Sequence, residues 1–375
     1  MLKVLLTATV QSHICQFHKP LVRMLRRHGD VEIHVAARDN LAEKNGLKLD
    51  FADKVFDLPF SRSPKSPDNI RAARELKRLI REEHYDIIHC NTPVGGVVTR
   101  LVAAGARRQG ARVIYTAHGF HFYQGSSKKS WTLLFPIEKR MSRRNDILIT
   151  INEEDYALAR ESFPCRVEHI HGVGVDAERY HTVPDTEAAG LKEELGYSPG
   201  QRLILSVGEL LPNKNHVMAV RAMRIVTDRF PEAKLLIAGN GPEKERLEEE
   251  ITALELENNV ELLGYCTHLE DYQRICDLSV ACSRREGLPL NVIEAMLSGN
   301  PVIAAHNRGH DELIRDGENG FLINHDDAEA LAGHICRLLS DDDLRRRLAA
   351  NAPGSVSLYT ASSVEKELEQ IYFGG

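Results

Sequence analysis

Short apolar segments rich in Val, Ile and Leu alternate with amphipathic segments along almost the whole chain. The apolar segments have no polar face, which is typical of parallel strands that helices cover on both sides. Alternation of strand and helix, twice over, predicts an α/β protein with two doubly wound domains. The expected strands are residues 3–6, 31–36, 54–58, 86–90, 112–116, 146–151, 167–171, 202–208, 234–239, 260–263, 278–282, 301–304 and 320–323. The clearest helical patterns are 69–83, 153–163, 216–229, 243–256, 290–298 and 328–339.

The length of 375 residues also favours two domains, at roughly 150 residues per domain. We place the boundary in the segment HGVGVDAERYHT, which gives a first domain of 1–173 and a second of 174–359. A last helix, about 362–372, has no strand after it. The sequence does not show where this helix packs, and packing of 360–375 back on the first domain is one possibility.

Charge is unevenly distributed between the two halves. Residues 1–170 carry 28 basic and 19 acidic residues, whereas 171–375 carry 20 and 35. The basic half would suit nucleic acid, anionic lipid or a phosphorylated substrate. No nucleic-acid recognition motif appears and the acidic half would repel such a partner, so we expect no nucleic acid.

We expect a cytoplasmic protein. The chain shows no secretory signal peptide and no apolar stretch of the roughly 18 residues that a membrane span needs. Its seven cysteines include no C-x-x-C pair, which argues against a zinc ribbon or a disulfide framework.

Ligands of doubly wound sheets bind outside the carboxyl ends of the strands, so strand ends are the places to search. One expected strand ends in SVGELLPNKNH, where Gly208 allows a tight turn and Lys214 lies near a helix start. A cation beside free helix N–H groups suits a diphosphate, although Lys214 would also serve as a solvated surface lysine. The next strand ends in AGNGP, where Asn240 and Gly241 belong to a turn without the G-x-G-x-x-G spacing. These glycines would alternatively do no more than make a tight turn.

The segment CSRREGLPLNVIEAMLSGNPVIA places Glu286 after a buried strand and Glu294 eight residues later in a helix. That spacing, about 12 Å of helical rise, is too long for a carboxylate pair that shares a proton. It suits two separate hydroxyl-bearing ends of one extended ligand, with N–H groups of Gly287 and Leu288 available to an anion. The alternative is a charge at a helix start and a surface glutamate.

Together these segments resemble the retaining, two-Rossmann (GT-B) glycosyltransferases of family 4. The likeness rests on the Glu-x7-Glu spacing and on the segments VGELLPNKN, AGNGPEKERL and HGVGVDAERYH. In the first half, HCNTPVGGVVTRLVA and YTAHGFHFYQG resemble the subgroup that builds bacterial exopolysaccharide or capsule repeat units. The resemblance implies a first domain that binds the acceptor and a second that binds a nucleotide diphosphate sugar, facing each other across a cleft.

The resemblance also implies roles for particular residues. Glu286 would bind the donor sugar as an orienting group rather than a nucleophile, and Glu294 would bind the ribose. Lys214 would bind the diphosphate, and His118 would face the sugar. The implied catalytic residues are Glu286, His118 and Lys214, and the implied donor-binding residues are Gly208, Glu209, Lys214, Asn240, Gly241, Glu286, Gly287, Leu288 and Glu294. Transfer would retain the anomeric configuration, with no cofactor and no metal.

Two departures from the family pattern bear on these roles. Glu209 stands where many members have an arginine, so a second cation would have to come from elsewhere, such as Arg284 or Arg285. The first loop, expected at Thr7–His13, lacks the paired glycines common there. His13 is therefore only an acceptor-side candidate.

Residues 120–144 combine six basic side chains and one acidic one with several apolar residues and the only tryptophan. Such a segment suits contact with an anionic membrane surface. A core helix with a charged outer face would have the same residue pattern. Lys128 and Lys129 are its acceptor-side candidates. With the family resemblance, the segment favours a polyprenyl-diphosphate-linked glycan acceptor, met at the inner face of the plasma membrane.

We therefore expect a metal-independent transferase that moves a hexose or N-acetylhexosamine from a nucleotide diphosphate sugar, UDP-linked by family resemblance, in exopolysaccharide or capsule synthesis. Two alternatives share the fold. One is a nucleotide-sugar 2-epimerase, for which no acid–base pattern is visible. The other is a sugar-nucleotide-binding protein without turnover.

Overall fold

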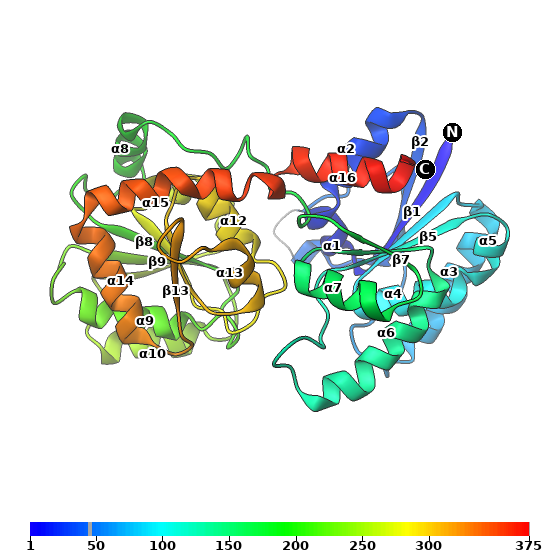
Figure 1. Ribbon diagram of the computed structural model, residues 1–375, viewed down its shortest axis with the longest axis horizontal. Helices are drawn as coiled ribbons and strands as arrows, with labels where there is room; N and C mark the ends of the chain where they lie inside the picture. The colour runs from blue at the N-terminus through cyan, green and yellow to red at the C-terminus, as the bar shows by residue number, and fades with distance from the viewer. Residues whose placement is uncertain (44–46, 375) are drawn as a thin grey trace. The chain divides into compact units, whose positions relative to one another are not determined.

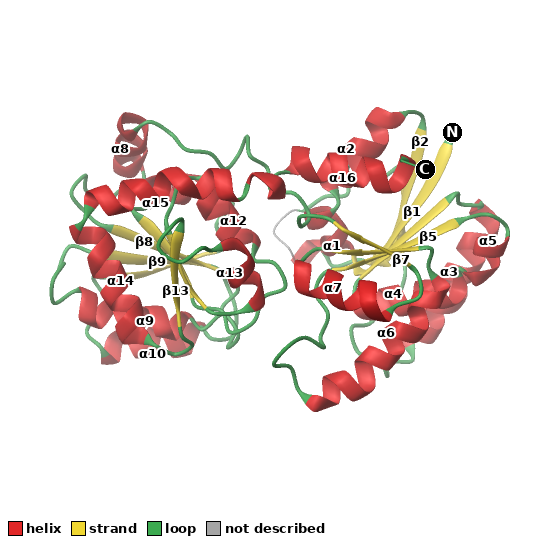
Figure 2. Cartoon of the chain, in the orientation of Figure 1, coloured by secondary structure: helices red, strands yellow, loops and turns green. Residues whose placement is uncertain are grey.

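The computed structural model describes residues 1–43 and 47–374, which form two compact units. The first unit combines Met1–Gly174 with the C-terminal segment from Ala361, and the second is Val175–Thr360. Each unit is a parallel sheet flanked by helices (Figures 1 and 2). This is the predicted architecture of two doubly wound domains.

The first sheet has seven parallel strands in the order β3-β2-β1-β4-β5-β6-β7. Its strands are β1 (Leu2–Val10), β2 (Val31–Arg38), β3 (Lys54–Asp57), β4 (Ile87–Asn91), β5 (Arg112–Ala117), β6 (Ile147–Thr150) and β7 (Arg166–His169). The helical segments of this unit are α1 (Gln11–Phe17), α2 (Lys19–His28), η1 (Leu41–Glu43), α3 (Asp68–Glu83), α4 (Pro93–Val102), α5 (Ala104–Arg108), η2 (Ser130–Leu134), α6 (Phe135–Met141), η3 (Ser142–Arg144), α7 (Glu153–Ser162) and α16 (Ala361–Phe373).

The second sheet has six parallel strands in the order β10-β9-β8-β11-β12-β13. Its strands are β8 (Leu203–Val207), β9 (Lys234–Ala238), β10 (Val260–Gly264), β11 (Leu278–Ala281), β12 (Val302–Ala305) and β13 (Gly320–Ile323). The helical segments are α8 (Asp185–Glu194), α9 (His216–Val226), α10 (Lys244–Ala253), α11 (Leu269–Ile275), α12 (Leu290–Leu297), α13 (Arg308–Leu313), α14 (Ala328–Ser340), α15 (Asp342–Ser355) and η4 (Ser357–Tyr359). Strand order reverses between β1 and β4 in the first sheet and between β8 and β11 in the second, which marks where ligands of such sheets bind.

All thirteen predicted strands are present, but the predicted loop Thr7–His13 is wrong. Strand β1 continues to Val10, and α1 begins at the next residue. The side chains of Thr7 and Thr9 are buried in the strand because their hydroxyls hydrogen-bond the hydroxyls of Thr99 and Thr92 at 2.9 and 2.8 Å. Without knowledge of these hydrogen bonds, the polar residues Thr7 and Thr9 indicate a loop rather than a buried strand.

Helix α16 packs against α2 in the first unit (Figure 1). Glu365 of α16 is buried and pairs with both Arg23 and Arg27 of α2. The hydroxyl of Tyr372 lies 2.5 Å from Nδ1 of the buried His89 in β4. These contacts return the end of the chain to the first sheet.

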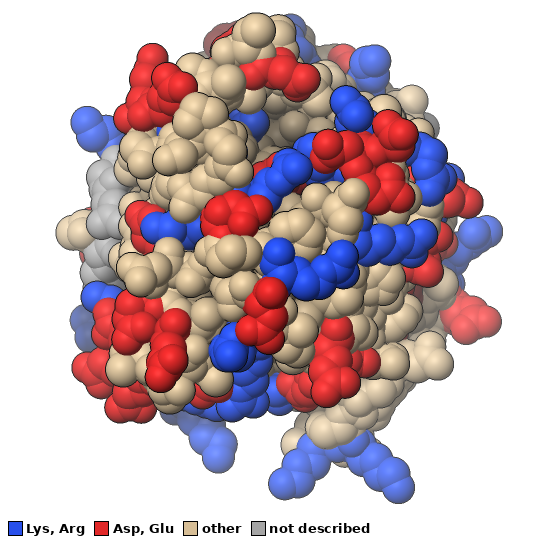
Figure 3. Space-filling model, turned by 90° about the vertical axis from the view of Figure 1, so that its left-hand side faces the viewer, with Lys and Arg blue, Asp and Glu red and all other residues tan. Residues whose placement is uncertain are grey.

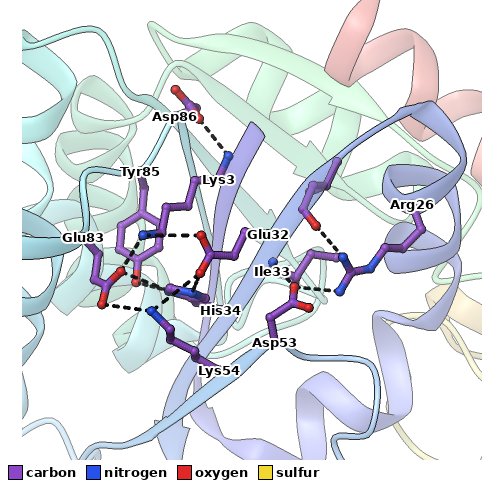
Figure 4. Close-up of polar contacts among 11 residues, drawn as sticks. Lys3, Arg26, Glu32, Ile33, His34, Asp53, Lys54, Glu83, Tyr85 and Asp86 are labelled. Carbon is purple, nitrogen blue, oxygen red and sulfur yellow. Dashed lines mark hydrogen bonds and ion pairs between the residues drawn. The ribbon is translucent and has the colours of Figure 1, made fainter. Parts of the chain in front are cut away.

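A polar network lies where β1, β2 and β3 begin (Figure 4). Lys3 pairs with Glu83 at 2.5 Å, and Lys54 lies 3.6 Å from both Glu32 and Glu83. His34, which is completely buried, contacts Glu32 and the Tyr85 hydroxyl at 2.8 Å each. Because the network lies at the amino ends of the strands, opposite the expected ligand edge, its role is structural.

The second half is strongly acidic, yet its surface is not a single negative field. Figure 3 shows acidic and basic side chains interspersed on the face it presents. Ion pairs such as Arg221–Glu250 at 2.5 Å and Lys244–Glu248 at 3.5 Å join opposite charges on the helices α9 and α10. Among the described residues, no helix is both long enough and apolar enough to cross a bilayer.

Candidate active site

An ion pair joins the carboxyl ends of the two central strands of the second sheet. Lys214 follows β8 and Glu286 follows β11, and Nζ of the lysine lies 2.7 Å from Oε1 of the glutamate. The two side chains are only 20% and 15% exposed. A Cβ at Gly208 would lie 3.1 Å from Cδ of Lys214, so the glycine leaves room for the lysine stem. Two residues predicted to bind one ligand thus lie together at the point where the strand order reverses.

The glycines of the two predicted turns are needed for backbone packing. A Cβ on Gly239 would lie 1.9 Å from the carbonyl oxygen of Gly208, and one on Gly241 would lie 2.4 Å from that of Leu210. The backbone N–H of Leu210 donates to the carbonyl of Asn240 at 2.9 Å. The two turns therefore lie against each other, and donor contacts from Asn240 and Gly241 stay a prediction. Glu209 is exposed beside Gly208.

The loop that carries Glu286, Gly287 and Leu288 is held from both sides. On one side, Asn213 donates its side-chain amide to the carbonyl of Arg285 at 2.9 Å. On the other, Nε of Arg308 donates to the carbonyl of Glu286 at 3.3 Å. Arg308 was not foreseen from the sequence, because 22 residues separate it from the loop it contacts.

Arg284, one of the two cations suggested from the sequence, is committed elsewhere. Its Nη2 lies 2.6 Å from Oδ1 of Asp326, and its side chain is 53% exposed. It also lines a cavity of about 140 Å³ to which neither Lys214 nor Glu286 contributes.

Glu294 lies in α12, where its carboxyl is largely enclosed by protein. This burial raises its pKa to about 8. Arg179 opposes the shift, whereas the negative charge of Glu270 adds to it. A glutamic acid in this state is a hydrogen-bond donor as well as an acceptor at neutral pH, which suits contact with hydroxyl groups.

The raised pKa of Glu294 predicts a pH-dependent stability. Between its ordinary value of 4.5 and about 8 the native carboxyl keeps a proton that the unfolded chain has lost. Stability therefore falls as pH rises through this window, with a slope of at most about 1.4 kcal/mol per pH unit from this group. Glu294→Gln, which stays neutral, is expected to lose this slope in urea titrations of the unfolding free energy. Glu249→Gln, at an exposed position on α10, is the control, and identical slopes in wild type and Glu294→Gln would contradict the assignment.

In the first unit, His118 and His13 meet at the carboxyl edge of the sheet. His118 follows β5 and His13 lies in α1, directly after β1; their Nε2 atoms are 3.1 Å apart. Nε2 of His118 also lies 3.1 Å from Oδ1 of Asn91, which can only accept, so this nitrogen carries the proton. Burial lowers the pKa of His118 to about 3, which makes it a neutral hydrogen-bonding group at pH 7. His13 lies against another histidine, and whether it contacts an acceptor stays a prediction.

Two features next to this pair were not predicted. The buried ring of His89 lies 5.7 Å from that of His18, which extends the group to four histidines. Thr92 has φ +64°, a backbone conformation that a β-branched residue rarely adopts. Neither feature has a sequence pattern that would reveal it, because both depend on contacts between distant strands.

In the basic segment 120–144, the aromatic residues and the aliphatic residues differ in exposure. Trp131 and Phe135 pack into the cluster around Phe122. The exposed apolar side chains are Leu133 (62%), Leu134 (37%) and Ile137 (47%). Lys128 and Lys129 are both exposed at the start of this segment. The ring of Trp131 is only partly buried against this cluster, and its part in a membrane-facing surface stays a prediction.

Among the described residues, no three His, Cys, Asp or Glu side chains are grouped so that they would hold a metal ion.

Two family models match the two halves of the chain. Residues 19–179 match the model described as Glycosyltransferase Family 4, and residues 190–354 match Glycosyl transferases group 1. The second match includes the turns and the loop that carry Lys214, Glu286 and Glu294.

Individual relatives extend over the whole chain. It is 39% identical to the putative glycosyltransferase EpsD of Bacillus subtilis over 372 residues, which is 99% of this chain and 96% of the relative. It is 26% identical to an Escherichia coli UDP-Gal:alpha-D-GlcNAc-diphosphoundecaprenol alpha-1,3-galactosyltransferase over 80% of this chain and 79% of the relative. The crystal structure of Anabaena Alr3699/HepE in complex with UDP has the same fold, with a TM-score of 0.81 at 21% identity over 100% of both chains. The chain therefore belongs to glycosyltransferase family 4 and is a glycosyltransferase with the two-domain GT-B fold.

Proposed function

We propose that the protein transfers a hexose or an N-acetylhexosamine from a UDP-sugar to a polyprenyl-diphosphate-linked glycan, with retention of configuration and without a metal ion, during exopolysaccharide or capsule synthesis. The observation that carries the proposal is the Lys214–Glu286 pair at the reversal point of the second sheet. A cation beside a sugar-binding carboxylate suits the two halves of a nucleotide sugar, its diphosphate and its hexose. We propose that the second unit binds the donor and the first the acceptor.

In the proposed reaction the acceptor hydroxyl attacks the anomeric carbon from the face that the diphosphate leaves. The bond from that carbon to the diphosphate oxygen breaks, and the same oxygen takes the hydroxyl proton. Lys214 stabilises the charge that develops on the leaving diphosphate, and Glu286 orients the sugar through its hydroxyls. N–H groups of Gly287 and Leu288 add fixed dipoles, Glu294 binds the ribose, and His118 contacts the sugar.

The proposed substrates are supported by the named activities of relatives. The Escherichia coli relative uses a UDP-sugar and a diphosphoundecaprenol-linked acceptor, and the Anabaena structure contains UDP. These features are those of the two relatives.

The assay that tests the proposal incubates the purified protein with a panel of sugar nucleotides and a polyprenyl-diphosphate N-acetylhexosamine. We expect release of UDP and one new glycoside whose anomeric configuration, read by NMR, matches the donor. A chelator is expected to leave the rate unchanged. Exclusive use of GDP-sugars, inversion of configuration, or loss of activity with the chelator would each contradict the corresponding part of the proposal.

We also propose that the segment 120–144 contacts the anionic surface that presents such an acceptor. Leu133, Leu134 and Ile137 are exposed on η2 and α6, next to the exposed basic side chains of Lys129 and Arg140. The only acidic residue of the segment, Glu138, is turned inward and pairs with Arg100. An apolar strip that lies among basic side chains of the same segment is complementary to a negatively charged bilayer.

Leu133→Asp combined with Ile137→Asp is expected to weaken binding to vesicles of phosphatidylcholine and phosphatidylglycerol by about tenfold or more, because two inserted side chains become charged. Binding by wild type is expected to fall as salt rises. Vesicle sedimentation measures both effects. Ile70→Asp, which alters an exposed apolar side chain on α3, is the matched control and should bind like wild type. Salt-insensitive binding, or equal binding by the double variant, would contradict a role for this surface.

A further inference from the structure

The proposed donor site has too little positive charge if Lys214 is its only cation. Glu286 lies 2.7 Å from that ammonium and compensates it. The neighbouring Gly208 is followed by Glu209, an exposed acidic residue on the same turn. A diphosphate leaving group gains negative charge during transfer, so a second cation beside Lys214 would stabilise it further.

The structure brings one arginine to this loop. Arg308 opens α13, and its Nε donates to the carbonyl of Glu286 at 3.3 Å. Strands β11 and β12 are parallel neighbours, so the loops after them leave the sheet at the same edge.

Close packing holds this arginine in place. A Cβ on Gly309 would lie 3.1 Å from Cβ of Glu286 and 3.2 Å from the carbonyl oxygen of Gly287. Asn307 donates its amide to the carbonyl of Ser283 at 2.8 Å, which ties the same two loops together. The position of Arg308 beside Glu286 is therefore determined by the backbone on both sides.

We propose that Arg308 is the second cation of the donor site and binds the diphosphate together with Lys214. A guanidinium has five N–H donors in a planar fork, so the bond from Nε to a carbonyl is compatible with donation to phosphate oxygens. The inference rests on the proposed function, because it names a further residue for the same donor site.

The test compares binding of UDP and UMP by isothermal titration. Arg308→Ala is expected to weaken UDP binding by about 10- to 100-fold, the effect of one lost charge-assisted hydrogen bond pair, and to change UMP binding far less. Arg308→Lys keeps the charge and is expected to recover part of the loss. Arg315→Ala, at an exposed arginine just after α13, is the control and should match wild type with both nucleotides.

A second variant separates charge from structure. Glu209→Arg, made in the Arg308→Ala background, is expected to restore UDP binding at least several-fold, because it returns a cation to the turn beside Gly208. A structural defect in the α13 loop would not be repaired by a change in another loop. Equal UDP affinity in wild type and Arg308→Ala, or no recovery with Glu209→Arg, overturns the inference. If wild type itself binds no UDP, the proposed UDP donor fails, and the role of Arg308 in binding it fails too.

Discussion

Lys214→Ala is expected to lower kcat for sugar transfer by about two to three orders of magnitude while leaving the fold intact, as loss of a preorganised charge-stabilising group does in other enzymes. The reason is the position of the ammonium, which follows β8 and lies on the Gly208 turn. A diphosphate held there would gain negative charge as the bond to the sugar lengthens, and water would replace the ammonium poorly. Initial rates of UDP release with saturating acceptor measure the effect.

Lys244→Ala is the control for this experiment. Lys244 follows the neighbouring glycine turn and pairs with Glu248 at 3.5 Å, and both side chains are more than half exposed. It should retain wild-type kcat. A Lys214→Ala enzyme with kcat within about fivefold of wild type would show that the leaving group is stabilised by other groups.

Substitution of Glu286, the proposed sugar-binding carboxylate, is a second test of the same site. Glu286→Ala is expected to abolish transfer as fully as Lys214→Ala, and the two losses should not add in the double variant, because the side chains act as one unit. Near-normal turnover by Glu286→Ala would show that the carboxylate is not part of the donor site.

The strands of this protein were predictable because parallel strands are continuous apolar runs. Leu203–Val207 and Leu278–Ala281, for example, lie within the predicted ranges 202–208 and 278–282. Helix ends were less well predicted: α9 stops at Val226, three residues before the expected end, since nothing in the sequence shows where packing ends. Strand β1 was cut short because the hydrogen-bond partners of Thr7 and Thr9 are more than 80 residues away.

For the candidate site, too, some features were predictable from local sequence and others were not. The roles of Lys214, Glu286 and Glu294 were suggested by local spacing and by family resemblance. The contact between Lys214 and Glu286 joins residues 72 positions apart, and it follows from the order of strands in the sheet. Arg308 lies within no motif, and the contacts of its neighbours Asn307 and Gly309 with the Glu286 loop place it there. Strand order, which local periodicity does not contain, was the missing information.

The largest stability effect is expected at a buried ion pair beneath the basic segment. Arg100 of α4 is completely buried, and its Nη2 lies 2.9 Å from Oε2 of Glu138 on α6. Its guanidinium also stacks on Tyr115, with Cζ 3.9 Å from the ring centre, and its Nε donates to the carbonyl of Gly96 at 3.0 Å. Within the described part of the chain, Nη1 has no hydrogen-bond partner. The guanidinium therefore depends on a single carboxylate for its charge.

Glu138→Ala is expected to lower the free energy of unfolding by about 3–5 kcal/mol, because it leaves a buried guanidinium without a counter-charge. The double variant Arg100→Met with Glu138→Leu is expected to recover most of this loss, since it removes the charge together with its partner. Urea titrations followed by the fluorescence of Trp131, the only tryptophan, report on this unit.

Arg71→Ala, which breaks the exposed pair with Asp68 on α3 of the same unit, is the control and should cost less than about 0.5 kcal/mol. If Glu138→Ala lowers the free energy of unfolding no more than this control does, the buried pair does not stabilise the first unit.

The Arg100–Glu138 pair also bears on the proposed membrane contact. Glu138 is buried and pairs with Arg100, so the charged side chains that residues 120–144 expose are all basic. The variant Arg100→Met with Glu138→Leu leaves these basic side chains in place and should still bind anionic vesicles. Loss of vesicle binding in that variant would mean that the pair itself positions the membrane-facing surface.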